Sequence, residues 1–143
     1  MKITNILVPV DHSACSEQAL AYALSLADSV GAKVNLLSVI GIPTYGVPDL
    51  GVGITAPMMD NLIADNQRAL EVMAKDRPAV SQTLVRAGDA RDVILQTAEE
   101  LGVDLIVMGT HGRRGISRAL LGSVTEMIVR TSPVPVLTVR GKK

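Results

Sequence analysis

Glycine and serine residues near the carboxyl-terminal end of the chain are spaced in a way that suits the binding of an anion. An apolar run at residues 105–108 predicts a buried strand that ends at Gly109. Gly112 follows, and after nine more residues come Gly122 and Ser123, at the expected start of a helix. Glycines let backbone N–H groups approach a ligand closely, and a helix N-terminus attracts anions. The spacing therefore predicts a phosphate-binding turn, with Ser123 as the N-cap of the helix.

A carboxylate with several possible roles lies at the other end of the chain. The apolar run at residues 3–10 predicts a buried strand, and Asp11 stands at its carboxyl end. Asp11 can cap the first helix, contact a ligand or help to hold Mg²⁺, and these roles are compatible. Asp11, His12 and Ser13 are adjacent, so they cannot form the in-line array of a Ser/His/Asp triad.

The elements that must position these residues follow from the hydrophobic pattern. We expect strands at residues 3–10, 33–40, 81–87, 104–109 and 134–140, and helices at residues 13–30, 58–77, 90–101 and 122–131. Gly31, Pro78 and Gly102 are the expected helix stops. The glycine- and proline-rich segment at residues 41–57 is predicted to be a long loop. The apolar side chains of the second helix that we expect to be buried are Met59, Leu62, Ile63, Leu70 and Met73.

Strands that alternate with helices predict a single α/β domain over residues 1–143. We expect one doubly wound, five-stranded parallel sheet with helices on both faces, and right-handed crossovers favour the strand order 3-2-1-4-5. The strand at residues 81–87 has a polar side and is expected at an edge. Ligands of such sheets bind at the carboxyl ends of the strands where the winding reverses. In this order the reversal brings Asp11 beside Gly109.

Composition excludes several classes of function. The formal net charge is zero, which argues against broad binding to nucleic acid or to an anionic membrane. The chain has no Trp or Phe and only two Tyr, so it lacks the stacking platforms of a single-strand nucleic-acid binder. No apolar run is long enough for a membrane span or a signal peptide, so we expect a cytoplasmic protein. Cys15 is the only cysteine and is expected to be a small apolar residue in a helix.

The spacing Gly109-x2-Gly112-x9-Gly122-Ser123 resembles the G-x2-G-x9-G-[ST] signature of the ATP-binding branch of the universal stress protein family. The resemblance covers the whole chain, because residues 6–13 (ILVPVDHS), 36–39 (LLSV) and 132–139 (SPVPVLTV) match as well. It implies the same doubly wound fold and an adenine nucleotide, ATP in the first place, as ligand.

The resemblance also implies which residues hold the adenosine part of that ligand. The backbone of Val39 would contact the adenine ring, and Pro9 and Val10 would form the floor of its pocket. Asp11 would contact the ribose or lie near the phosphates. Gly109 would approach the ribose.

The phosphates, by the same resemblance, would be held by Gly112, Gly122, Ser123 and Val124, with Ser123 using both its hydroxyl and its N–H. Asp11 is the candidate ligand for an accompanying Mg²⁺. In the family's usual dimer the last strands of the two copies pair with each other. In this chain that would place Val134 to Val139 at a homodimer interface.

We therefore interpret the chain as an ATP-binding regulatory protein of the stress response, in which nucleotide occupancy changes the loop at residues 41–57 or the binding of a signalling partner that the sequence does not identify. One alternative is a slow ATPase or phosphotransferase that uses Arg113 or Arg114, although no P-loop motif is present. Another is a structural dimer that binds no nucleotide. His111 is interpreted as a loop residue rather than a catalytic base.

Overall fold

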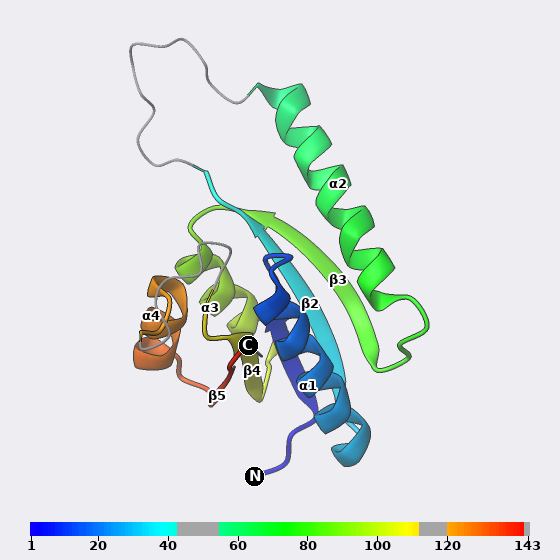
Figure 1. Ribbon diagram of the computed structural model, residues 1–143, viewed down its shortest axis with the longest axis vertical. Coiled ribbons are helices and arrows are strands. Elements are labelled where there is room, and N and C mark those ends of the chain that lie inside the picture. The colour runs from blue at the N-terminus through cyan, green and yellow to red at the C-terminus, as the bar shows by residue number, and fades with distance from the viewer. Residues whose placement is uncertain (43–54, 112–119, 142–143) are drawn as a thin grey trace.

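Five parallel strands form one sheet in the order β3-β2-β1-β4-β5, which confirms the predicted order (Figure 1). The structure is a computed structural model that describes residues 1–42, 55–111 and 120–141. The strands are β1 (Asn5–Pro9), β2 (Lys33–Ile40), β3 (Val80–Ala87), β4 (Leu105–Gly109) and β5 (Val136–Val139). The helices are α1 (Ala14–Val30), α2 (Ala56–Ala74), α3 (Ala90–Leu101) and α4 (Ser123–Thr131).

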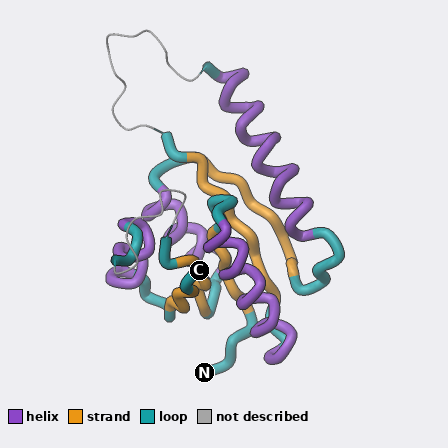
Figure 2. The backbone as a smooth tube through the Cα atoms, viewed as in Figure 1, coloured by secondary structure: helices purple, strands orange, loops and turns teal. Residues whose placement is uncertain are grey.

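The sheet has an apolar core on each face, because side chains alternate along its strands. On β1, Ile6 and Val8 pack with α1 and α2, and Leu7 packs with α3 and α4. Figures 1 and 2 show the two helix pairs on opposite sides of the strands. Burial on both faces accounts for the continuous apolar runs of the central strands.

Capping residues mark the start of α1 and the ends of α1 and α3 where the sequence predicts these limits. Ser13 is the N-cap of α1, and its Oγ accepts a hydrogen bond from the N–H of Ser16 at 3.2 Å. Gly31 and Gly102 end α1 and α3 in the left-handed conformation, with φ of 71° and 59°. A residue without Cβ adopts this conformation at little cost.

Helix α2 differs from the prediction at both ends. It begins at Ala56 because Thr55 caps it, accepting a hydrogen bond from the N–H of Met58 at 3.4 Å. It ends at Ala74 rather than at residue 77, because the backbone at Asp76 turns to a left-handed φ of 59° before Pro78 is reached.

The expected burial of α2 is also wrong for its first half. Leu70 is fully buried and Met73 packs against the core, but Leu62 and Ile63 are 39% and 38% exposed. Figure 1 shows the reason, since the first half of α2 extends past the carboxyl ends of the strands. Within the described ranges, no helix combines the length and the hydropathy that a membrane crossing requires.

Candidate functional site

The carboxyl ends of β1 and β4 lie side by side, as the predicted winding reversal requires. The two strands pair in parallel, with Leu7 opposite Ile106. Beyond β4, the N–H of Thr110 donates to the carbonyl of Val139 at 3.0 Å and extends the pairing with β5. The chain leaves β1 toward α1 on one face and leaves β4 toward α4 on the other, so ligand-binding loops can meet at this edge.

The turn between β1 and α1 holds Asp11 in place. The Asp11 Oδ1 accepts a hydrogen bond from the N–H of Ser13 at 3.0 Å, and the Asp11 N–H donates to Ser16 Oγ at 3.4 Å. Ser13, not Asp11, caps the helix. The Nε2 of His12 lies 3.1 Å from the Oδ1 of Asn66 on α2.

Gly109, the first glycine of the predicted turn, is required by packing as well. A Cβ at residue 109 would lie 2.8 Å from the Sγ of Cys15 and 3.1 Å from its carbonyl carbon and oxygen. The first turn of α1 therefore approaches the end of β4 as closely as a glycine allows. Cys15 is a buried free thiol whose Sγ donates to the carbonyl of Val139 at 3.4 Å, in keeping with its predicted role as a small helix residue.

The N-terminus of α4 is attached to the same strand end. The N–H of Gly122 donates to the carbonyl of Thr110 at 2.8 Å, and the hydroxyl of Thr125 donates to the carbonyl of Gly109 at 2.8 Å. Gly122 is the N-cap, and no side chain caps the helix. The prediction that Ser123 is the N-cap is therefore wrong by one residue, because Ser123 already has helical geometry and is exposed. Because glycine has no side chain, the N-cap itself supplies no side-chain acceptor to the amides of the first turn.

The residues implied for the adenine pocket lie at the same edge but expose little side chain. The side chain of Val10 is 4% exposed within the α1 and α2 core, and its N–H donates to the carbonyl of Leu37. Val39 is the penultimate residue of β2, and its side chain packs against the core beneath α3 and α4. Pro9 ends β1 and is partly buried. Any contact of Val10 with a ligand at the edge is therefore made by its backbone.

Several predicted features lie outside the described residues. They are Gly112, the arginines at positions 113 and 114, and residues 43–54 of the expected loop. His111 is described: its Nδ1 lies 2.9 Å from the hydroxyl of Thr110, and its Nε2 is buried with no hydrogen-bond partner among the described residues. No group of three or more His, Cys, Asp and Glu side chains is arranged to hold a metal ion in the described part of the chain.

Sequence reasoning missed Thr125 and Asn66, which fix the site from α4 and α2. Thr125 is 4% exposed and lies three residues before the buried Ile128, so the two residues share one face of α4. A polar residue on this apolar face was the feature of the sequence that could have identified it. Asn66 gives no comparable signal, because its partners are distant in the sequence.

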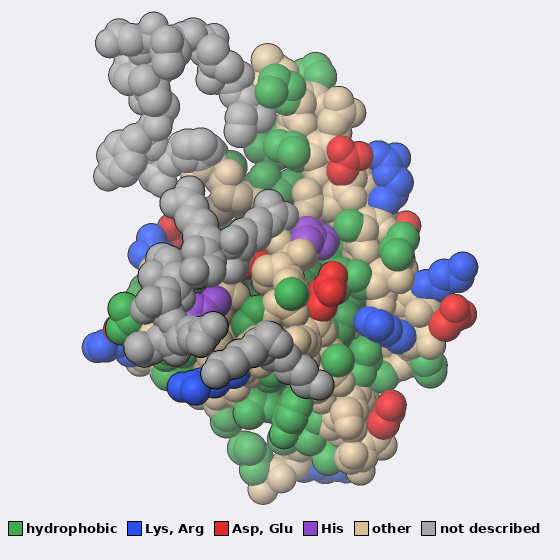
Figure 3. All heavy atoms as spheres, in the orientation of Figure 1, with side chains coloured by type: hydrophobic (Ala, Val, Ile, Leu, Met, Phe, Trp, Pro, Cys, Tyr) green, Lys and Arg blue, Asp and Glu red, His purple; other side chains and the backbone are tan. Residues whose placement is uncertain are grey.

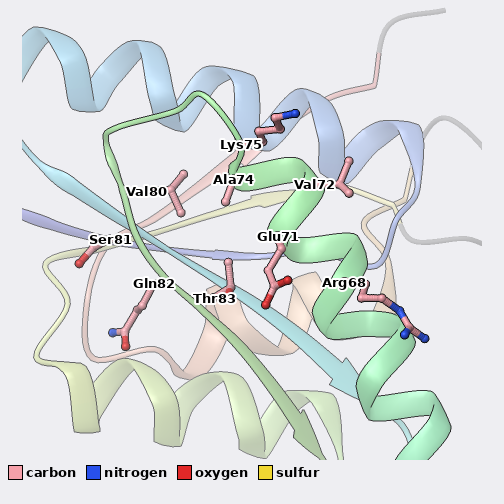
Figure 4. A pocket seen from close by; sticks show the side chains of 9 residues that line it. All are labelled: Arg68, Glu71, Val72, Ala74, Lys75, Val80, Ser81, Gln82 and Thr83. Atoms are coloured by element: carbon pink, nitrogen blue, oxygen red, sulfur yellow. The ribbon is translucent and has the colours of Figure 1, made fainter.

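A shallow hollow elsewhere on the surface contains none of the predicted site residues. It has a volume of about 620 Å³ and lies between α2 and the edge strand β3 (Figure 4). Its lining mixes charged and polar residues (Arg68, Glu71, Lys75, Ser81, Gln82 and Thr83) with apolar ones (Val72, Ala74 and Val80). The hollow is open to solvent. In the sheet, β2 lies between β3, which borders the hollow, and the neighbouring strands β1 and β4, whose carboxyl ends form the candidate site.

The family model of the universal stress protein family matches residues 2–140. The chain belongs to the universal stress protein family. It is 33% identical over 142 residues to universal stress protein MJ0531 of Methanocaldococcus jannaschii, covering 96% of this chain and 82% of that protein. It is also similar to MJ0577 of the same organism, whose solved structure has a TM-score of 0.85 at 29% identity and covers 100% of this chain and 99% of that chain.

Two further solved universal stress proteins share the fold. One is in complex with cAMP, with a TM-score of 0.68 and 24% identity, covering 99% of this chain and 100% of that one. The other, from Archaeoglobus fulgidus, is in complex with dAMP, with a TM-score of 0.66 and 20% identity, covering 97% of this chain and 99% of that one.

Proposed function

We propose that this universal stress protein binds an adenine nucleotide, with ATP as the first candidate, at the edge where β1 and β4 end. The observation that carries the proposal is the uncapped N-terminus of α4, which Gly122 and Thr125 hold against the end of β4. Open amides and the helix dipole favour an anion there. The parallel pairing of β1 and β4 brings Asp11 to the same edge.

The conformation of Gly122 supports a role in making room for phosphates. Its φ of −60° and ψ of 151° are values that any residue adopts, so the backbone does not require glycine there. We infer that the missing side chain leaves the amides of Ser123 and Val124 accessible. Gly112 would complete this cradle.

The other residues fit the adenosine part of the ligand. Val39 would present its backbone to adenine beside Pro9 and Val10, and Asp11 would accept a hydrogen bond from the ribose or face a phosphate-bound Mg²⁺. Two proteins of this fold are in complex with cAMP and with dAMP, which is consistent with an adenine ligand. We assign the protein a regulatory role in the stress response of the cytoplasm, in which occupancy of the site alters the binding of a signalling partner.

The cradle is tested by the double substitution Gly122→Val with Ser123→Ala in nucleotide-free protein titrated with ATP and Mg²⁺. Loss of charge-assisted hydrogen bonds should weaken binding by at least about tenfold. Ser29→Ala, an exposed helical serine at the far end of α1, is the control and should bind as the unmodified protein does. An affinity unchanged by the double substitution would contradict the cradle.

We further propose that the protein is a homodimer through β5. The carbonyl of Pro135 accepts a hydrogen bond from the N–H of Ile106 in β4, and the carbonyl of Val139 accepts one from the N–H of Thr110, just beyond β4. Because successive carbonyls of a strand point to opposite sides, the backbone groups of Val136 and Thr138 face the outer edge of the sheet. β5 is the last strand of the sheet in the described part of the chain, and an apolar edge strand is suited to pairing with a second copy.

A further inference from the structure

A cluster of three polar side chains joins α2 to the ends of β1 and β2. The Oδ1 of Asn66 accepts hydrogen bonds from the Ser38 hydroxyl at 2.9 Å and from His12 Nε2 at 3.1 Å. The Nδ2 of Asn66 donates to the carbonyl of Leu62 within α2 at 2.8 Å. That bond orients the amide, so Oδ1 is the acceptor and the proton of the His12 ring lies on Nε2.

The backbone of His12 needs such a tether. Its φ of 62° lies in the left-handed region, which residues with a Cβ adopt only when the surroundings hold them there. The next residue, Ser13, donates its N–H to Asp11 Oδ1 at 3.0 Å. A change in the His12 backbone would therefore move the carboxylate of Asp11.

We propose that Asn66 and His12 are positioning residues of the nucleotide site, through which α2 holds the turn that carries Asp11. This inference rests on the proposed function. Asn66 preorganises the turn, so binding does not have to order it. By linkage, a nucleotide that stabilises the turn also stabilises the contact with α2.

This tether connects the site to the exposed half of α2. Met58, Leu62 and Ile63 precede Asn66 and are 49%, 39% and 38% exposed. Figure 3 shows apolar side chains along this part of the helix. Nucleotide binding is therefore expected to slow amide exchange in α2 as well as in the turn.

The test compares Asn66→Leu, Asn66→Asp and His12→Gly in calorimetric titrations with ATP. Asn66→Leu removes the acceptor and should weaken binding by about tenfold, whereas Asn66→Asp keeps the acceptor for Ser38 and His12 but loses the Nδ2–H that donates to Leu62, and should weaken binding less than Asn66→Leu does. In His12→Gly, glycine adopts the left-handed φ without strain but has no ring to bond to Asn66, so this variant should also bind ATP more weakly. Gln67→Leu is the matched control, because Gln67 makes a comparable bond from α2 to Thr83 on β3 at 2.8 Å, away from the turn.

Hydrogen exchange on the same proteins supplies a second readout. Without nucleotide, Asn66→Leu should speed exchange at residues 10–13, and with ATP it should abolish the protection of α2, while Gln67→Leu should do neither. Equal ATP affinities for Asn66→Leu and Gln67→Leu, or full affinity in His12→Gly, would overturn the inference. Absence of binding by the unmodified protein would instead overturn the proposed function, and exchange at residues 10–13 would then decide whether α2 holds the turn.

Discussion

At the scale of single residues, Asn35 is a buried polar group whose partners are all present. It is 1% exposed, and its Nδ2 donates to Asn5 Oδ1 at 2.6 Å and to the carbonyl of Ile6 at 3.0 Å. Its Oδ1 accepts from Gln82 at 2.9 Å, and Asn5 in turn donates to the carbonyl of Leu101 at 2.8 Å. The network crosses β3, β2 and β1 and reaches the end of α3, so it fixes the strand register.

Replacing Asn35 by leucine should destabilise the protein by about 1–3 kcal/mol, because Asn5 and Ile6 would lose a buried partner. Gln82→Ala, at the exposed end of the same network, should change stability by less than about 0.5 kcal/mol, since water can replace its bond. Urea unfolding measures both. Similar losses for the two variants would contradict the role given to Asn35.

Gly109→Ala should destabilise the protein by about 1–3 kcal/mol through the clash with Cys15. Adding Cys15→Ala to Gly109→Ala should recover part of the lost stability. The second change removes the Sγ that lies 2.8 Å from a Cβ at residue 109 but leaves the backbone carbon and oxygen of residue 15 at 3.1 Å from it. Gly41→Ala is the control, since a Cβ there meets no atom within 4 Å. Thermal unfolding of these three variants, of Cys15→Ala alone and of the unmodified protein tests this, and additive effects of the Gly109 and Cys15 changes would refute the contact.

Several local capping roles could be predicted from the sequence, and side-chain contacts between distant residues could not. Ser13, Gly31 and Gly102 act on a few neighbouring backbone groups, so their caps follow from residue type. The approach of Cys15 to Gly109 and the bond between His12 and Asn66 depend on how helices settle on the sheet. No short pattern in the sequence encodes such contacts.

At the scale of elements, Asp104 ties the start of β4 to the start of β1. Its carboxylate accepts hydrogen bonds from the N–H of Thr4 at 2.8 Å, the Thr4 hydroxyl at 2.8 Å and the N–H of Asn5 at 2.9 Å. These donors, the Thr4 N–H foremost, hold the pKa of Asp104 below its ordinary value of 3.8.

This lowered pKa makes part of the stability pH-dependent. A carboxyl group whose pKa is lower in the folded state stabilises the protein fully above 3.8, and the contribution disappears as the pH falls through the lowered value. Asp104→Asn should therefore lower Tm at pH 7, and the difference from the unmodified protein should shrink below pH 3.8. Thermal unfolding across that range tests it, with Thr4→Ala expected to show a smaller loss. A difference independent of pH would rule out the carboxylate charge as its source.

Among the elements, α2 was the least predictable. The spacing of its apolar residues indicates which side of the helix faces the sheet, but not how far the sheet extends along the helix. Leu62 and Ile63 were therefore expected in the core, although the sheet ends before it reaches them. The edge position of β3 was predicted correctly, because an edge strand shows its polar side in the sequence.

At the scale of the whole molecule, the strand order followed from the alternation of elements and the handedness of crossovers. That order alone predicted that β1 and β4 are neighbours whose carboxyl ends lie side by side, and the pairing of Leu7 with Ile106 confirms it. Gly112, which the resemblance assigns to the phosphates, lies outside the described residues, so its role stays a prediction.

The proposed dimer predicts a specific effect at the outer edge of β5. Thr138→Pro removes an N–H that faces outward and leaves the bonds to β4 in place, so it should convert a dimer into a monomer at micromolar concentration. Thr138→Val keeps the N–H and should remain dimeric. Sedimentation velocity distinguishes the two states, and an unmodified protein that is monomeric under these conditions would exclude the β5 dimer.

The measurement that tests the central proposal most directly is a calorimetric titration of nucleotide-free protein with ATP and Mg²⁺, with AMP and GTP as comparators. A site built from Val39, Asp11 and the N-terminus of α4 predicts saturable binding of ATP in preference to GTP, and weaker binding of AMP because it carries fewer phosphates. Absence of binding by all three nucleotides would contradict the site and would leave the structural dimer as the better account of this chain.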